Sequence, residues 1–265
     1  MNFGWNPAAK LEGNMHSILR DSYDIMRTTG DFSILELSVD FEEAERLERI
    51  FNPDVRRMLR NFCKEYDFEI FLHLLYGRED FSRVRLNAGD EEFVSFVKTI
   101  VEFFDFVPLG YAILHTGRRF RRLSVEEQIE NVVKCVNVVK DVHPLVAVEM
   151  GRKGAFMDSV DEILAVAERE VEIVVNTSLL WAASLFDRKI LEENIEKLST
   201  LKCAAIHWGA SELRNGREIH NLSLLDSSLP AEIFKALKSE NHIVEIFGSA
   251  KLVAENVSFL KKLLG

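Results

Sequence analysis

Three consecutive stretches of the chain decide its fold: LGYAILH at residues 109–115, VEEQIENVVKCVNVVKDV at 125–142 and LVAVE at 145–149. The first and third are short apolar runs with little polar alternation, which is typical of strands buried on both faces of a parallel sheet. The middle stretch has apolar residues at helical spacing, and Ser124 with Glu127 predicts a capping box at its start. Together the three stretches predict two parallel strands joined by a helix.

The same alternation recurs along the whole chain of 265 residues. The short apolar runs are Asn2–Trp5, Ser33–Leu37, Phe68–His73, Leu109–His115, Leu145–Glu149, Glu172–Asn176, Cys203–His207 and His242–Phe247. Eight strand and helix units of about 33 residues each match the chain length that is typical of a (β/α)8 barrel. A doubly wound open sheet is the rival, but the chain lacks its glycine-rich G-x-G-x-x-G turn. We therefore predict an α/β protein, a (β/α)8 TIM barrel forming a single domain over residues 1–265.

The composition limits the classes of function. The chain has 43 acidic and 33 basic residues, a net charge of −10 and 47% hydrophobic residues, which excludes disorder and argues against a basic coat for nucleic acid. Cys63, Cys135 and Cys203 form no C-x-x-C pair, so neither a disulfide framework nor a zinc knuckle is predicted. We find no signal peptide or membrane-spanning run and expect a cytoplasmic protein with no membrane partner. Gln128 is the single glutamine, a bias associated with thermophiles.

Polar side chains of metal-binding type stand at or near the ends of seven apolar runs. They are Glu36, His73, His115, Glu149, Asn176, His207 and Glu245. In a (β/α)8 barrel the carboxyl ends of the strands meet at one rim, where active sites form. Three imidazoles and several carboxylates at one rim predict a divalent cation among them, and mixed ligands of this kind suit zinc, manganese, cobalt or iron better than calcium. For any single histidine, a structural role at a strand end is the alternative.

At these residues the chain resembles the xylose isomerase-like barrel superfamily, and it is most similar to endonuclease IV, the family of metal-dependent apurinic/apyrimidinic endonucleases. The residues that follow the family's order are His73, His115 in HTG, Glu149, Asn176, His207, Glu218 and His220 in REIH, and Glu245. The resemblance implies that these residues are metal ligands and that the protein binds one or two divalent ions, zinc or manganese. The implied reaction is hydrolysis of a phosphodiester at abasic sites in DNA.

Three departures from the family's pattern bear on this hypothesis. Asn176 replaces an aspartate, Leu179 replaces a histidine and Glu218 replaces a shorter aspartate. In the family the lost histidine belongs to a third metal site, so that site is doubtful here. Asn176 and Leu179 also favour a further alternative, a non-catalytic barrel with a degenerate metal site.

The sister branch of the superfamily, the sugar isomerases and epimerases, supplies the second hypothesis. Its four metal ligands match Glu149, Asn176, His207 and Glu245 in order. In that branch the two glutamates move a proton, which makes Glu149 and Glu245 our predicted catalytic residues. An arginine of the seventh loop holds substrate there, a role that Arg214 or Arg217 can fill.

The loops predict an anionic substrate. Residues 117–122, GRRFRR, carry four arginines next to His115: Arg118, Arg119, Arg121 and Arg122. At a metal-lined rim such a cluster suits phosphate, although a solvated charge run is an equal alternative. We also predict that Glu36, Tyr76 and Trp208 contact substrate. The predicted partner is abasic-site DNA or a phosphorylated sugar, and the oligomeric state is left open.

Overall fold

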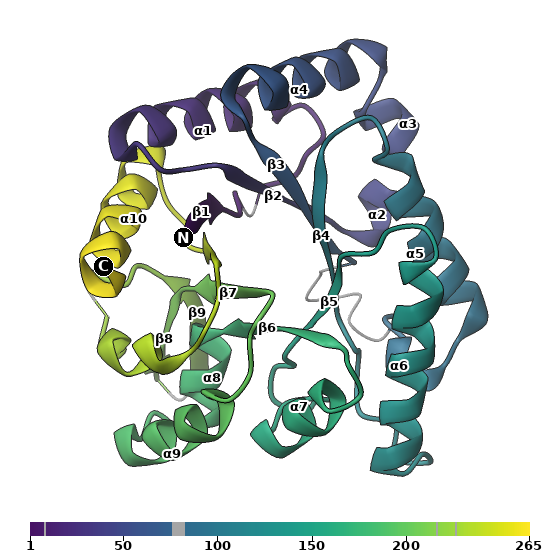
Figure 1. The fold of residues 1–265 in the computed structure, drawn as a ribbon, viewed down its shortest axis with the longest axis vertical. Helices are drawn as coiled ribbons and strands as arrows, with labels where there is room; N and C mark the ends of the chain where they lie inside the picture. The colour runs from purple at the N-terminus through teal and green to yellow at the C-terminus, as the bar shows by residue number, and fades with distance from the viewer. Residues whose placement is uncertain (8, 76–82, 216, 226) are drawn as a thin grey trace.

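The computed structural model describes residues 1–7, 9–75, 83–215, 217–225 and 227–265 (Figure 1). Eight parallel strands close into a barrel in the order β1-β10-β7-β6-β5-β4-β3-β2. Their bounds are β1 Asn2–Trp5, β2 Ile34–Val39, β3 Glu69–Leu74, β4 Leu109–Leu114, β5 Val146–Glu149, β6 Glu172–Asn176, β7 Ala205–Trp208 and β10 Asn241–Val244. The ring is closed by β1, which pairs with both β2 and β10. The predicted (β/α)8 barrel fold is confirmed.

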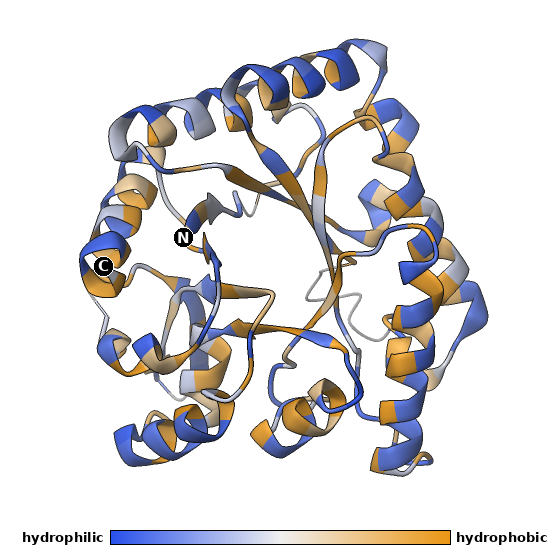
Figure 2. Ribbon diagram, in the orientation of Figure 1, coloured by the Kyte–Doolittle hydropathy of each residue, from blue (hydrophilic) through white to orange (hydrophobic). Residues whose placement is uncertain are grey.

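Helices surround the barrel, with their polar faces outward and their apolar faces toward the strands (Figure 2). The α-helices are α1 Met15–Thr29, α2 Phe41–Ala44, α3 Leu47–Ile50, α4 Pro53–Tyr66, α5 Glu91–Phe103, α6 Val125–Lys140, α7 Val160–Ala167, α8 Thr177–Ala183, α9 Arg188–Leu198 and α10 Ala250–Leu264. Two 3-10 helices span Leu86–Ala88 and Ala231–Ala236. The predicted capping box at Ser124 and Glu127 opens α6. Among the helices of the described residues, none is long and apolar enough to cross a bilayer.

Six of the eight predicted strands have different bounds in the structure, and only Asn2–Trp5 and Glu172–Asn176 are unchanged. The seventh begins at Ala205 rather than Cys203, and the last ends at Val244 rather than Phe247. The amide of Glu245 still donates to the carbonyl of Trp208 in β7 at 2.9 Å. The chain then leaves the barrel, and the amide of Phe247 donates to the carbonyl of Asn221 at 3.0 Å. Asn221 belongs to an antiparallel hairpin that the sequence analysis did not predict, formed by β8 Ala210–Arg214 and β9 Arg217–Leu222 after β7.

An apolar layer fills the barrel interior. Every strand except β1 contributes to it, and its members are Ile34, Phe71, Ile113, Ala147, Val174, Ala204, Ala205 and Ile243. Side chains of a strand point to the same face at every second residue, so the residues two positions further on also point inward, one layer nearer the carboxyl ends. That next layer is where the polar residues of the sequence lie.

Candidate metal centre

A polar layer lies inside the barrel, next to the apolar layer and nearer the carboxyl ends of the strands. Each of its residues stands two positions after a member of the apolar layer in the sequence. They are Glu36, His73, His115, Glu149, Asn176, His207 and Glu245, all seven of the polar residues predicted from the strand ends. Six of them are buried and expose 5% or less, while the His115 side chain exposes 11%. The predicted convergence is therefore present in the structure.

Asn6 completes this layer and was missed by the sequence analysis. It follows β1 directly and is 1% exposed, and its Nδ2 donates to Glu36 Oε1 at 2.6 Å. The strand-end rule that found the other seven residues applies equally to NFGWN at residues 2–6.

Glu149 occupies the centre of the cluster. Its Oε2 lies 3.1 Å from His73 Nε2, and its Oε1 lies 2.9 Å from His207 Nδ1 and 3.0 Å from Asn176 Nδ2. Burial opposes ionisation of this carboxyl, but the charges of His207 and His73 outweigh it and hold its pKa well below the ordinary value. Glu149 thus faces ligand-type atoms on both sides, as a bridging carboxylate must.

His73 and His115 face each other with their Nε2 atoms 2.7 Å apart. Burial lowers the pKa of both rings, but Glu149 and Glu36 overcome it at His73 and raise its pKa to about 10. For His115, burial and the charge of His73 lower the pKa to about 4. In the metal-free protein one ring is therefore charged and donates to its neutral neighbour.

Glu245 differs from the other two carboxylates of the cluster. Burial and repulsion from Glu149 outweigh the attraction of His207 and raise its pKa to about 7. Its Oε2 lies 3.8 Å from His207 Nδ1 and accepts a hydrogen bond of 2.8 Å from Asn176 Nδ2. This carboxyl can exchange a proton near neutral pH, as a general acid or base must.

Asn176 does not present its carbonyl oxygen to the cluster, which corrects the prediction that it is a metal ligand. Its Oδ1 caps α8 by accepting from the amides of Ser178 and Leu179 at 3.1 and 3.2 Å. The amide nitrogen, a donor that cannot bind a cation, points at Glu149 and Glu245. Asn176 therefore holds two carboxylates in place rather than holding an ion.

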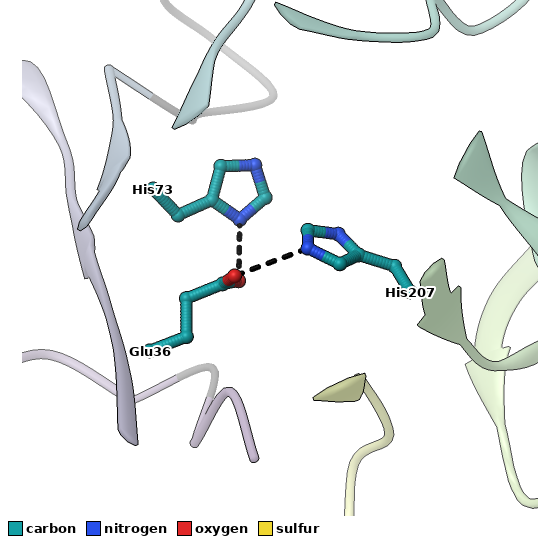
Figure 3. A group of neighbouring side chains, drawn as sticks. All are labelled: Glu36, His73 and His207. Atoms are coloured by element: carbon teal, nitrogen blue, oxygen red, sulfur yellow. Dashed lines mark hydrogen bonds and ion pairs between the residues drawn. The ribbon is translucent and has the colours of Figure 1, made fainter. Parts of the chain in front are cut away.

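Glu36 lies inside the barrel, which corrects its prediction as a substrate contact. It is 0% exposed and its oxygens reach His73 Nδ1 and His207 Nε2, both at 3.0 Å (Figure 3). Burial opposes its ionisation, but the charges of His207 and His73 lower its pKa to about 2. The carboxylate therefore contacts the ligand histidines inside the barrel.

Glu218 and His220 lie on β9 of the hairpin and do not join the cluster, contrary to their prediction as metal ligands. The Nδ1 atom of His220 lies 3.1 Å from Ser178 Oγ, and its Nε2 lies 3.4 Å from Glu218. The hairpin packs on α8 and holds both side chains there. Arg214 pairs with Glu212 of its own strand, while Arg217 at the start of β9 is exposed.

Trp208 is not at the barrel mouth, which corrects its prediction as a substrate contact. Since His207 points inward, the next side chain points outward, and Trp208 is 0% exposed. Its Nε1 donates to His242 Nδ1 at 3.0 Å, and its ring packs on Phe234. Tyr76 lies outside the described residues.

The arginines after β4 divide into two kinds. Arg119 forms ion pairs with Glu162 and with Asp158, the latter at 2.8 Å, so it ties its loop to the segment before α7. Because these carboxylates compensate its charge, the structure argues against a substrate role for Arg119. The other three arginines of this loop are exposed: Arg118, Arg121 and Arg122.

The cluster fits a divalent metal. Among the described residues, three groups offer ligand atoms within 4.8 Å of one another: Glu36, His73 and His207; His73, His115 and Glu149; and Glu149, His207 and Glu245. The last two groups share Glu149 and combine imidazole with carboxylate, a donor set that suits zinc and manganese. The structure thus has ligand sets for two ions side by side.

Comparisons with known proteins establish the fold. No protein-family model and no curated protein sequence matches the chain. Among solved structures, the chain is similar to endonuclease IV from Thermus thermophilus, with 16% identity, a TM-score of 0.68 and coverage of 100% of this chain and 99% of that one. It is also similar to a zinc-bound IolI protein, with 14% identity, a TM-score of 0.71 and coverage of 100% and 98%. D-psicose 3-epimerase from Clostridium cellulolyticum has 10% identity, a TM-score of 0.70 and coverage of 100% and 99%. At these identities the likeness shows the barrel fold and no activity.

Proposed function

We propose that the chain is a divalent-metal-dependent hydrolase that cleaves a phosphodiester at abasic sites in DNA. The observation that carries this proposal is the pair of ligand groups sharing Glu149. His73 and His115 complete one group, and His207 and Glu245 complete the other. The His73 and His115 pair is an addition that a single-ion sugar isomerase site does not need.

Divalent ions held by His73, His115, Glu149, His207 and Glu245 would supply Lewis acidity for the attacking and leaving oxygens of a phosphodiester. The residues of the chain then have separate tasks. Asn176 orients Glu149 and Glu245 through its amide, and these two carboxylates would hold the ions together with the three histidines. Zinc and manganese are the ions we expect, because both accept mixed imidazole and carboxylate ligands.

The surroundings of the site support an anionic substrate. His115, the most exposed of the ligand histidines, directly precedes the loop that carries Arg118, Arg121 and Arg122. All three arginines are exposed, and arginine binds phosphate oxygens in a bidentate manner. The likeness in fold to endonuclease IV agrees with this substrate class.

The test is cleavage of a labelled DNA duplex with one abasic-site analogue by protein loaded with zinc, manganese or magnesium. We expect a nick at the abasic position, no cleavage of the undamaged duplex, and loss of activity in His115→Ala. His143→Ala is the matched control, because His143 contacts the carbonyl of Gly110 at the other end of the barrel. Absence of nicking with all three metals would contradict the proposal.

Sugar epimerisation is the second candidate, and one observation favours it. Glu149 and Glu245 accept from the same amide of Asn176, and their pKa values are shifted in opposite directions. Two carboxyls poised in this way suit removal and return of a proton beside a carbonyl. Conversion of a ketose such as D-psicose by zinc- or manganese-loaded protein, without nicking of DNA, would select this function. A metal content below about one ion per chain would instead favour a non-catalytic barrel.

A further inference from the structure

The polar layer contains a carboxylate that the proposed chemistry does not use. Glu36 is fully buried on β2, in the same layer of the barrel as the other polar residues. Each of its oxygens contacts a different imidazole: Oε1 is hydrogen-bonded to His73 Nδ1 at 3.0 Å, and Oε2 forms an ion pair with His207 Nε2 at 3.0 Å (Figure 3). One side chain of β2 thus connects histidines of β3 and β7.

Both histidines turn their second nitrogen toward Glu149. His73 uses Nε2, at 3.1 Å from Oε2, and His207 uses Nδ1, at 2.9 Å from Oε1. Glu36, His73, Glu149 and His207 therefore form a closed ring in which carboxylates and imidazoles alternate. Each imidazole has one nitrogen on the ligand side of the ring and the other on the Glu36 side.

From this ring we infer that Glu36 is a positioning residue, which fixes opposite tautomers in two metal-binding histidines and so couples the two ion sites. A nitrogen that binds a metal carries no proton, so the proton of each neutral ring must lie on its other nitrogen. An ionised carboxylate accepts hydrogen bonds and donates none, so it selects that proton position. His73 then carries its proton on Nδ1, whereas His207 carries it on Nε2.

The neighbours of Glu36 orient its carboxylate. Asn6 Nδ2 donates to Glu36 Oε1 at 2.6 Å and lies 3.2 Å from His73 Nδ1, so it competes with Glu36 for that ring nitrogen, and Ser38 Oγ donates to Asn6 Oδ1 at 3.1 Å. The donors of these bonds are an amide and a hydroxyl, neither of which is acidic enough to protonate a carboxylate oxygen. Carboxylates that accept the free N–H of a ligand histidine typically improve metal affinity by about 10–100-fold.

The inference rests on the metal centre of the proposed function but not on its reaction. Glu36→Gln is the sharpest variant, because an amide offers one acceptor and one donor in place of two acceptors. The amide cannot present an acceptor to both imidazoles, so one of them must lose its contact with a carboxylate oxygen or reverse its tautomer. Glu172→Gln is the matched control, since this residue begins β6 at the opposite end of the barrel.

The experiment measures zinc affinity by competition with a chromophoric chelator, together with imidazole ¹⁵N shifts of the zinc-loaded wild-type protein. We expect Glu36→Gln to bind at least one zinc ion about 10–100-fold more weakly, and Glu172→Gln to bind as the wild type does. In the wild type, the shifts should show Nδ1–H at His73 and Nε2–H at His207, a result that does not depend on the variant folding. Equal zinc affinity in Glu36→Gln, or the same tautomer at both histidines, would overturn the role of Glu36. A wild-type protein that binds no zinc would overturn the metal centre itself.

Discussion

Replacement of Asn176 by Asp changes one group in the centre of the site and keeps the shape of the side chain. The Oδ1 atom that caps α8 remains, since aspartate caps helices as well as asparagine does. The Nδ2 atom, which donates to Glu149 at 3.0 Å and to Glu245 at 2.8 Å, becomes an oxygen. In the variant, the carboxyl group of residue 176 faces those of Glu149 and Glu245, which lose their shared hydrogen-bond donor.

The cost follows from the bonds that are lost. A hydrogen bond to a charged group contributes about 1.5–3 kcal/mol, so two such bonds contribute about 3–6 kcal/mol to the metal-free protein. Uptake of one proton by the three carboxyls restores one bond, so we expect a net loss of about 3 kcal/mol in the free energy of unfolding near pH 8. The loss should be smaller near pH 6, where that proton is bound more readily.

Zinc should reverse the effect. A third carboxylate adds an anionic ligand, and we expect the zinc affinity of Asn176→Asp to rise at least tenfold, which corresponds to about 1.4 kcal/mol. The assay is urea unfolding of wild type and variant at both pH values, with a chelator and with excess zinc. Asn256→Asp is the control, because buried Asn256 on α10 donates to Ser223 and to the carbonyl of Leu252, and neither partner is a carboxylate.

Two outcomes would contradict these expectations. If metal-free Asn176→Asp is as stable as the wild type at pH 8, the amide of Asn176 does not face the two carboxylates. If zinc stabilises Asn176→Asp and Asn256→Asp equally, the position is not at a metal site.

Three further predictions concern the surroundings of the site. Acid should destabilise the metal-free protein through Glu36, because the pKa of this carboxyl is about 2 and its ordinary value is 4.5. The ionised carboxylate therefore contributes about 3 kcal/mol to the free energy of unfolding above pH 4.5, and this contribution is lost as the pH falls toward 2. The difference in the free energy of unfolding between wild type and Glu36→Gln, measured in urea, should therefore narrow from pH 5 to pH 3. A difference that stays constant would contradict this role of Glu36. Gly117→Ala should lower the melting temperature, because Gly117 has φ 93° and a Cβ there would lie 2.2 Å from the carbonyl oxygen of Val84; an unchanged calorimetric transition would contradict this. Trp208→Phe should cost about 1–3 kcal/mol by leaving His242 Nδ1 without its donor, while the zinc content stays the same. A loss of zinc in that variant would place Trp208 at the mouth after all.

The positions of the cluster could be predicted because a strand has a two-residue period. Ile113 and His115 in YAILH, or Val174 and Asn176 in EIVVN, must point to the same side, and a closed barrel has only one interior. The rule needed no knowledge of partners.

The direction of each polar group could not be predicted in this way. Asn176 stands at a strand end that is also a helix N-cap, and the backbone amides of α8 compete for its oxygen. Trp208 follows His207 immediately, so the same period that brings the histidine inward turns the tryptophan outward. The hairpin that removes His220 from the cluster depends on pairing between β8 and β9, which no apolar run indicated.

The sequence by itself determined the barrel and the seven strand ends that supply its polar layer, because apolar periodicity and strand order are local properties of the chain. Only the tertiary structure decided what these residues do toward one another. Glu36 contacts His73 and His207 because β2, β3 and β7 curve around one axis, and hydrogen-bond roles follow from distances of about 3 Å between groups far apart in the chain. Such distances are set by closure of the barrel, which no local pattern encodes.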